Sequence, residues 1–272
     1  MSVLYIIATP IGNLEDISQR ALRILGEVNL IAAEDTRRTR KLLTAYGIKT
    51  PLTSFFEHSK KPKLDSLLER LEQEDIALVS EAGMPGISDP GYNLIREAIN
   101  RGISVTAIPG PSVLPTALAI SGLPAHQFIY LGFLPRKKGE KKRLLESIAT
   151  EPRTIVVFEA PHRLLATLTD IETVFGDRRL AVCRELTKLH EEVFRGTVHQ
   201  AIAHFSHPRG EFTIVIEGYS GNSEGIPDSI REELRNLRRE GVSVKDAVTQ
   251  LAGTTKVSKK TLYQLWLELP LP

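Results

Sequence analysis

The alternation of short apolar runs with helical segments constrains the fold of this chain most strongly. Runs rich in aliphatic side chains, typical of strands buried on both faces, occupy residues 3–8, 28–33, 76–79 and 103–108. Segments with apolar residues at helical spacing accompany them at residues 15–26, 36–46, 63–73 and 92–101. Strands that alternate with helices predict a mostly parallel sheet with helices on both faces.

A second α/β pattern begins near residue 123, and a purely helical segment follows it. We expect strands at residues 128–131, 154–158, 180–184 and 212–217, a pairing segment at 191–195, and helices at 164–175 and 198–205. Residues 219–227 are polar and contain glycine, which is typical of a linker. After it, a helix at 228–240 and two more, capped by Ser243 and Ser258, are expected. The predicted parts are an N-terminal α/β domain at 1–122, a C-terminal α/β domain at 123–220 and a small helical, helix-turn-helix-like module at 225–272.

Composition excludes several classes of protein. The chain has 35 Lys and Arg against 33 Asp and Glu, a net charge of +2, which argues against coating nucleic acid through global charge. With one cysteine, Cys183, it has neither an intramolecular disulfide nor a cysteine-rich metal site, and its seven histidines show no metal-binding spacing. The sequence has no apolar run of about 20 residues and no basic stretch before its first apolar run. We therefore expect a cytoplasmic protein with no membrane segment and no metal.

Three predicted strands end in turns rich in glycine and proline, at residues 8–14, 80–91 and 108–112. Ligands of open α/β sheets bind at the carboxyl ends of the strands, so these turns predict a ligand site at one sheet edge. Ser112 could cap the following helix or receive a ligand carboxylate. The sequence lacks the dinucleotide fingerprint G-x-G-x-x-G, a Walker A loop and the G-x-S-x-G elbow, so those three site types have no support.

Two basic clusters stand out against the balanced charge. The first contains Arg37, Arg38, Arg40 and Lys41, and the second contains Arg136, Lys137, Lys138, Lys141, Lys142 and Arg143. Either cluster alone would usually be a solvated surface. Together, beside a predicted ligand site, they favour a phosphate-rich partner.

Seven collinear motifs resemble one family. They are LYIIATPIGNLEDIS (4–18), LIAAEDTRRTRKLL (30–43), SEAGMPGISDPG (80–91), IPGPSVLPTAL (108–118), LGFLPRKKGEK (131–141), FEAPHRL (158–164) and CRELTKLHEEVFRGT (183–197). They are similar to the tetrapyrrole (corrin/porphyrin) methylase superfamily, in its branch of bacterial 16S rRNA ribose 2′-O-methyltransferases. The resemblance covers essentially the whole chain, including a helical C-terminal module.

The resemblance implies a fold, a cofactor and a substrate. It implies two α/β domains of the tetrapyrrole-methylase type with S-adenosyl-L-methionine in the cleft between them, commonly as a homodimer. The implied acceptor is the ribose 2′-oxygen of a cytidine in the decoding centre of 16S rRNA, within the 30S subunit. The cofactor residues that carry over are Pro10, Gly12, Met84, Ile87, Ser88, Asp89, Ser112 and, on its motif position alone, Phe158. The implied RNA-binding residues are Arg37, Arg38, Arg40, Lys41, Arg136, Lys137, Lys138, Lys141 and Lys142.

Relatives in the superfamily often have a Gly-Asp-Pro triplet in the central loop, where this chain has Gly83, Met84 and Pro85. Without that carboxylate, Met84 would contact the cofactor through its backbone or its sulfur. Methyl transfer from a sulfonium to a ribose hydroxyl is mainly a positioning task, helped by a nearby base. We expect Glu81 or Asp35 to be that base, ahead of Glu34 and Lys188.

Two other functions stay open from the residues alone. The same fold and cofactor could serve a small acceptor such as a tetrapyrrole, or a modified protein side chain. The basic clusters and the helical module argue against a small planar acceptor, which needs neither. A DNA-binding role for the C-terminal helices would need a basic recognition helix, yet residues 225–272 hold eight Lys and Arg against six Asp and Glu.

Overall fold

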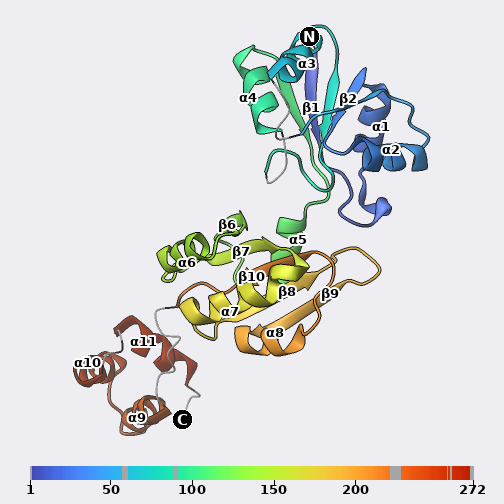
Figure 1. Cartoon of the computed structure of the whole chain (residues 1–272). Coiled ribbons are helices and arrows are strands. Elements are labelled where there is room, and N and C mark those ends of the chain that lie inside the picture. Colours follow the sequence, from blue (N-terminus) through green and yellow to red (C-terminus); the bar gives the residue numbers. More distant parts are fainter. Residues whose placement is uncertain are drawn as a thin grey trace. The chain divides into compact units, whose positions relative to one another are not determined.

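The computed structural model describes residues 2–56, 61–87, 91–220, 228–255, 257 and 259–269. The chain divides into two compact units, each described separately below. Unit 1 contains Met1–Ser121, Cys183–Val193 and Gly210–Thr213. Unit 2 contains Gly122–Val182, Phe194–Arg209 and Ile214–Pro272. Figure 1 shows the elements of both units.

Unit 1 is built on a five-stranded sheet of order β3-β2-β4-β1-β5, in which each strand is parallel to its neighbours. Its strands are β1 (Val3–Ile7), β2 (Leu30–Ala33), β3 (Leu52–Ser54), β4 (Ile76–Val79) and β5 (Ser104–Ile108). The parallel α/β fold and four of these strands confirm the prediction. β3 was not predicted, because three residues after a proline are too short to show a periodic pattern.

Helices cover both faces of this sheet (Figure 1). One face packs against α1 (Gln19–Glu27) and α2 (Thr36–Ala45), and the other against α3 (Lys61–Leu71) and α4 (Tyr92–Asn100). Successive residues of β2 face opposite cores, with Ile31 in the first and Leu30 in the second. Burial on both faces explains why these strands are continuous apolar runs. The helix α5 (Val113–Ser121) follows β5.

The helix predicted at residues 15–26 begins later than expected. Residues Leu14–Asp16 form a 3₁₀ turn, η1, whose N-cap Asn13 accepts a hydrogen bond from the Glu15 amide. The α-helix starts only at Gln19, because the Ser18 hydroxyl accepts from the Ala21 amide at 3.1 Å. Two successive caps therefore divide what the apolar spacing predicts as one helix.

The second five-stranded sheet has the order β6-β7-β10-β8-β9. Its strands are β6 (Phe128–Phe133), β7 (Thr154–Glu159), β8 (Arg179–Arg184), β9 (Glu192–Thr197) and β10 (Phe212–Ile216). It is accompanied by α6 (Lys138–Ser147), the 3₁₀ turn η2 (Pro161–Arg163), α7 (Leu164–Phe175) and α8 (Val198–His204). The central strand β10 is buried along its whole length. This second α/β layer matches the predicted fold class.

The last three helices form their own hydrophobic cluster. They are α9 (Asp228–Arg239), α10 (Val244–Thr254) and α11 (Lys259–Glu268), and Leu234, Leu251 and Leu262 are fully buried among them. Ser243 caps α10 as predicted, accepting from the Asp246 amide. The predicted cap Ser258 and residues 221–227 of the predicted linker lie outside the described residues. Within the described part of the chain, no helix has the length and apolar character to cross a bilayer.

The helix α4 offers a matched test of this packing. Leu94 is completely buried in the core of unit 1, whereas Ile99 on the same helix is 59% exposed. We expect Leu94→Ala to lower the free energy of unfolding by about 2–5 kcal/mol, through lost burial and a residual cavity. Ile99→Ala should change it by no more than about 0.5 kcal/mol. Urea denaturation of both variants measures this, and equal losses would contradict the described burial.

Candidate functional site

The three glycine-rich turns meet at the carboxyl edge of the first sheet. After β1, Thr9 exchanges two backbone hydrogen bonds of 2.9 Å with Gly83, which follows β4. After β5, Gly110 lies so close to β1 that a Cβ there would come within 3.1 Å of the Ala8 Cβ. Gly83 has a φ of 80°, which glycine adopts without steric cost. The predicted gathering of the three turns is therefore present in unit 1.

A fourth segment, residues 185–191 after β8, lies beside the first turn. A Cβ on Gly12 would come within 2.4 Å of Lys188 and 2.7 Å of the Thr187 hydroxyl. Glu185 and Thr187 have φ angles of 48° and 67°, which are uncommon for residues with a Cβ. Such backbone strain is found preferentially at functional sites. Positive φ at these residues has no sequence signature, and within this segment only Lys188 was predicted to have a role, as a candidate base.

Ion pairs hold this strained segment. Glu185 accepts hydrogen bonds from the Glu211 amide at 2.8 Å and from Lys188 at 3.0 Å, and Lys188 also contacts the Glu211 carboxylate at 2.7 Å. Burial alone would lower the pKa of Lys188, but its hydrogen bonds to Glu211 and Glu185 outweigh burial and raise the pKa. A lysine held charged in this way is a poor general base. Lys188 therefore serves better to position the segment beside Gly12.

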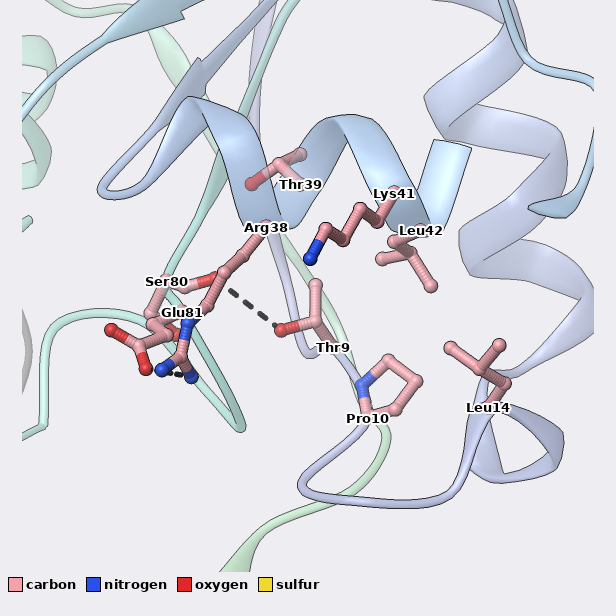
Figure 2. Close-up of a pocket in the computed structure, with 9 residues that line it drawn as sticks. All are labelled: Thr9, Pro10, Leu14, Arg38, Thr39, Lys41, Leu42, Ser80 and Glu81. Carbon is pink, nitrogen blue, oxygen red and sulfur yellow. Dashed lines mark hydrogen bonds and ion pairs between the residues drawn. The ribbon is translucent and has the colours of Figure 1, made fainter. Parts of the chain in front are cut away.

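A cavity of about 180 Å³ opens in unit 1 next to the Thr9–Gly83 contact. Figure 2 shows its lining, which comes from the first turn, from α2 and from the end of β4. The lining residues are Thr9, Pro10, Leu14, Arg38, Thr39, Lys41, Leu42, Ser80 and Glu81. Pro10, Leu14 and Leu42 form an apolar wall, and the ammonium end of Lys41 is directed into the group of labelled side chains (Figure 2). A cavity with one apolar wall and several polar groups is typical of a small-ligand or nucleotide site.

Of the predicted site residues, Pro10, Arg38, Lys41 and Glu81 lie together in this cavity. Thr39 and Leu42 also line the cavity and were not predicted, although Leu42 lies one helical turn after Arg38 on α2. The sequence also did not predict three further lining residues, because their place in the cavity depends on how the turns fold together. These are Thr9, Leu14 and Ser80.

The acidic candidates have different partners. Asp35 is the N-cap of α2, and the amides of Arg37 and Arg38 donate to it at 2.8 and 3.2 Å. These backbone hydrogen bonds, with the charges of the two arginines, lower the pKa of Asp35. Glu34 accepts from the Glu81 amide at 3.1 Å. Glu81 forms an ion pair with Arg38 at the cavity, and its side chain is 38% exposed. Glu81 is therefore better placed than Asp35 to receive a proton from a ligand.

The other predicted cofactor residues have varied surroundings. Met84 packs against the core shared with α3 and α4, so its side chain is held by the fold. Ile87 is 58% exposed, and Ser112 directly precedes α5. Phe158 belongs to unit 2, where it contacts Tyr130 and Phe133. Ser88 and Asp89 lie outside the described residues.

The basic clusters are exposed, with one exception. Arg37, Arg38, Arg40 and Lys41 are all exposed on α2, and Arg136, Lys137, Lys138 and Lys142 are exposed in unit 2. Lys141 is buried, and its ammonium contacts Asp170 at 2.6 Å and Thr167 at 3.3 Å. The expectation that Lys141 binds RNA is therefore wrong, because its charge is neutralised inside unit 2. The described residues contain no group of three histidine, cysteine, aspartate or glutamate side chains arranged to hold a metal ion.

Comparison with known proteins gives close relatives over nearly the whole chain. The protein named ribosomal RNA small subunit methyltransferase I of Synechocystis is 48% identical over 99% of both chains. The protein of the same name from Thermotoga maritima is 54% identical over 80% of this chain and 99% of its own. The one from Escherichia coli O157:H7 is 42% identical over 97% and 94%.

Solved structures support the same fold. A cobalt precorrin-4 methyltransferase superposes with a TM-score of 0.59 at 17% identity, over 79% of this chain and 94% of its own. A diphthine synthase superposes with a TM-score of 0.60 at 14% identity, over 80% and 90%. The family model of the tetrapyrrole (corrin/porphyrin) methylases matches residues 3–202. The chain therefore belongs to the tetrapyrrole (corrin/porphyrin) methylase family.

Proposed function

We propose that this protein is an S-adenosyl-L-methionine-dependent methyltransferase of 16S rRNA. Its acceptor is the ribose 2′-oxygen of a cytidine in the decoding centre, and its substrate is the small ribosomal subunit. The observation that carries the proposal is the cavity beside the three turns, where Arg38 and Lys41 lie with Glu81. Relatives at 40–54% identity bear the name ribosomal RNA small subunit methyltransferase I, which supports the substrate class.

The proposal includes the domain organisation of the enzyme, its cellular location and its oligomeric state. We assign residues 1–122 and 123–220 as the two α/β domains and residues 225–272 as a helical appendage. The enzyme acts in the cytoplasm as a homodimer. These assignments follow from the resemblance to the rRNA methyltransferases and from the change of sequence character after residue 220.

The residues at the sheet edge fit the proposed cofactor. The close approach of Gly110 to Ala8 and the positive φ of Gly83 need residues without a Cβ, and such residues also let a ligand approach the main chain closely. In the neighbouring segment, the Thr187 hydroxyl is buried and has no hydrogen-bond partner among the described residues. A buried polar atom without a partner is costly unless a ligand or water meets it. Pro10, Gly12, Met84, Ile87, Ser88, Asp89, Ser112 and Phe158 remain the proposed cofactor residues.

S-adenosyl-L-methionine supplies a methyl group already activated by its positive sulfur. The protein's own residues then have two tasks, to orient the ribose and to accept a proton. We assign the second task to Glu81, which is exposed at the cavity and paired with Arg38. Arg38 and Lys41 would hold the phosphates that flank the target ribose, since both cations line the same cavity. Asp35 then orders α2 as its N-cap and does not exchange protons.

The proposed reaction is tested by transfer of a labelled methyl group. Purified protein with labelled S-adenosyl-L-methionine should label isolated 30S subunits that lack the modification. After alkaline hydrolysis of the RNA, label should remain in one dinucleotide, because a 2′-O-methyl group blocks cleavage at its own position. Label in a base, in a ribosomal protein, or only in a small molecule such as a tetrapyrrole would overturn the proposal.

The assignment of Glu81 is tested by a pair of amide variants under single-turnover conditions. Glu81→Gln should lower the rate of methyl transfer by about 10²–10⁴-fold, the usual contribution of a general base. Asp35→Asn should keep a rate within a few-fold of wild type, because asparagine is also a good N-cap. Calorimetric cofactor binding and the melting temperature serve as controls for both variants. If Glu81→Gln reacts at the wild-type rate, or Asp35→Asn loses as much, the assignment is wrong.

A further inference from the structure

Phe133 is an exposed aromatic residue with an unusual position. It ends β6, the edge strand of the second sheet, and 60% of its surface is exposed. The register of β6 against β7 shifts between Tyr130 and Phe133, and Gly132 within the shift has a φ of 62°. Such bulges often redirect a side chain near a functional site. At this exposure, core packing accounts for only part of the ring surface of Phe133.

The ring of Phe133 rests on two further aromatic rings. Its centroid lies 5.8 Å from that of Phe158, at an interplanar angle of 71°. Phe158 in turn contacts Tyr130, with centroids 5.0 Å apart and an angle of 60°. These edge-to-face contacts support Phe133 from the sheet side and leave more than half of its surface to solvent.

Arg163 fixes the chain that follows Phe133. Its guanidinium donates to the carbonyl of Leu134 at 2.8 Å and to that of Pro135 at 3.3 Å. The same guanidinium pairs at 3.2 Å with Glu159, whose side chain is completely buried. Leu134 is itself buried, at 2% exposure. The residues on the carboxyl side of Phe133 are therefore held in place by a buried charge.

The buried contacts continue into α7 and α6. The Thr167 hydroxyl donates to Glu159 at 2.6 Å, and Lys141 donates to Thr167 at 3.3 Å while pairing with Asp170 at 2.6 Å. Hydrogen-bonded buried charges of this kind specify one arrangement of the groups they join. Here they join α6, α7 and the end of β6. This explains why Lys141, alone among its basic neighbours, points inward.

Exposed cations begin three residues after Phe133. Arg136, Lys137 and Lys138 are exposed between the end of β6 and the first turn of α6, elements that are adjacent in Figure 1. The Lys137 side chain is 81% exposed, and its ion pair with Glu140 at 3.1 Å is solvated and therefore weak. An exposed ring that is followed within a few residues by exposed cations matches an unpaired nucleotide, whose base stacks while its phosphates contact the charges.

We propose that Phe133 is a stacking site for an unpaired base of the RNA substrate, with Arg136 and Lys137 contacting the adjacent phosphates. The inference rests on the proposed function and adds a recognition residue outside the cavity of unit 1. Charge complementarity selects RNA over a second copy of the chain, because an apolar self-contact gains nothing from flanking cations. The buried contacts through Arg163 hold the ring and the cations in one fixed arrangement.

Equilibrium binding to 30S subunits tests this proposal. Phe133→Ala should weaken binding about 5- to 150-fold, the range expected for the loss of one stacked base. Phe133→Trp should restore it, because any aromatic ring can stack. Phe128→Ala is the matched control, since Phe128 is an exposed phenylalanine at the other end of the same strand. It should bind as wild type.

Salt dependence separates stacking from charge. Phe133→Ala should lower affinity at every salt concentration and leave the slope of log affinity against log salt concentration unchanged. The double variant Arg136→Ala with Lys137→Ala should flatten that slope by about 0.7–0.9 per charge removed.

Wild-type binding by Phe133→Ala would overturn the proposal. The proposal would also be overturned if Phe133→Ala bound 30S subunits normally but lost cofactor affinity, because the ring would then contact the cofactor. The same holds if the variant bound 30S subunits normally but no longer formed the dimer, because the ring would then contact a second copy of the chain. If wild-type protein neither binds nor methylates 30S subunits, the proposed function itself fails.

Discussion

The two backbone hydrogen bonds between Thr9 and Gly83 are the constraint on which the candidate site depends. They join the chain after β1 to the chain after β4, two strands that are already neighbours in the sheet. The close approach of Gly110 to Ala8 adds the chain after β5. This is possible because β1 lies between β4 and β5, the two strands whose turns it meets. The cavity with Arg38 and Glu81 opens next to this junction.

Charge in this protein is arranged locally and not globally. The net charge is only +2, yet α2 and the segment before α6 each expose several cations. A small net charge limits non-specific attraction of the whole protein to phosphates. Local clusters of cations still attract phosphates at the places where a specific contact is needed. Three acidic residues likewise have separate structural and functional roles. Asp35 orders a helix, Glu159 orders the end of β6, and Glu81 alone of these three lies at the cavity.

The periodic elements could be predicted from the sequence because burial on one or two faces leaves a repeating apolar pattern. The boundaries of α7 and the cap at Ser243 are read directly from such signals. The gathering of the three turns also follows, since parallel strands place their carboxyl ends at one edge. The late start of α1 is explained by capping. Ser18 is the N-cap, so the helix begins at Gln19 even though the apolar spacing extends further toward the N-terminus.

What could not be predicted depends on contacts between distant segments. The burial of Lys141 follows from Asp170 and Thr167, which lie on another helix. The exposure of Phe133 follows from a register shift that only the pairing of β6 with β7 defines. The strained backbone at Glu185 and Thr187 leaves no trace in residue type. Local composition therefore predicts the wrong environment for two residues. Lys141 is a buried cation within a basic run, and Phe133 is an exposed aromatic residue within an apolar run.

The central claim is that the three turns of unit 1 hold the cofactor at one edge of the sheet. Hydrogen–deuterium exchange with and without saturating S-adenosyl-L-methionine tests it most directly, with saturation established by calorimetry. We expect slower exchange in peptides covering residues 8–14, 80–87 and 108–113, and unchanged exchange in α9 and α10. Protection absent from all three turns at saturation, or confined to segments elsewhere in the chain, would contradict the claim.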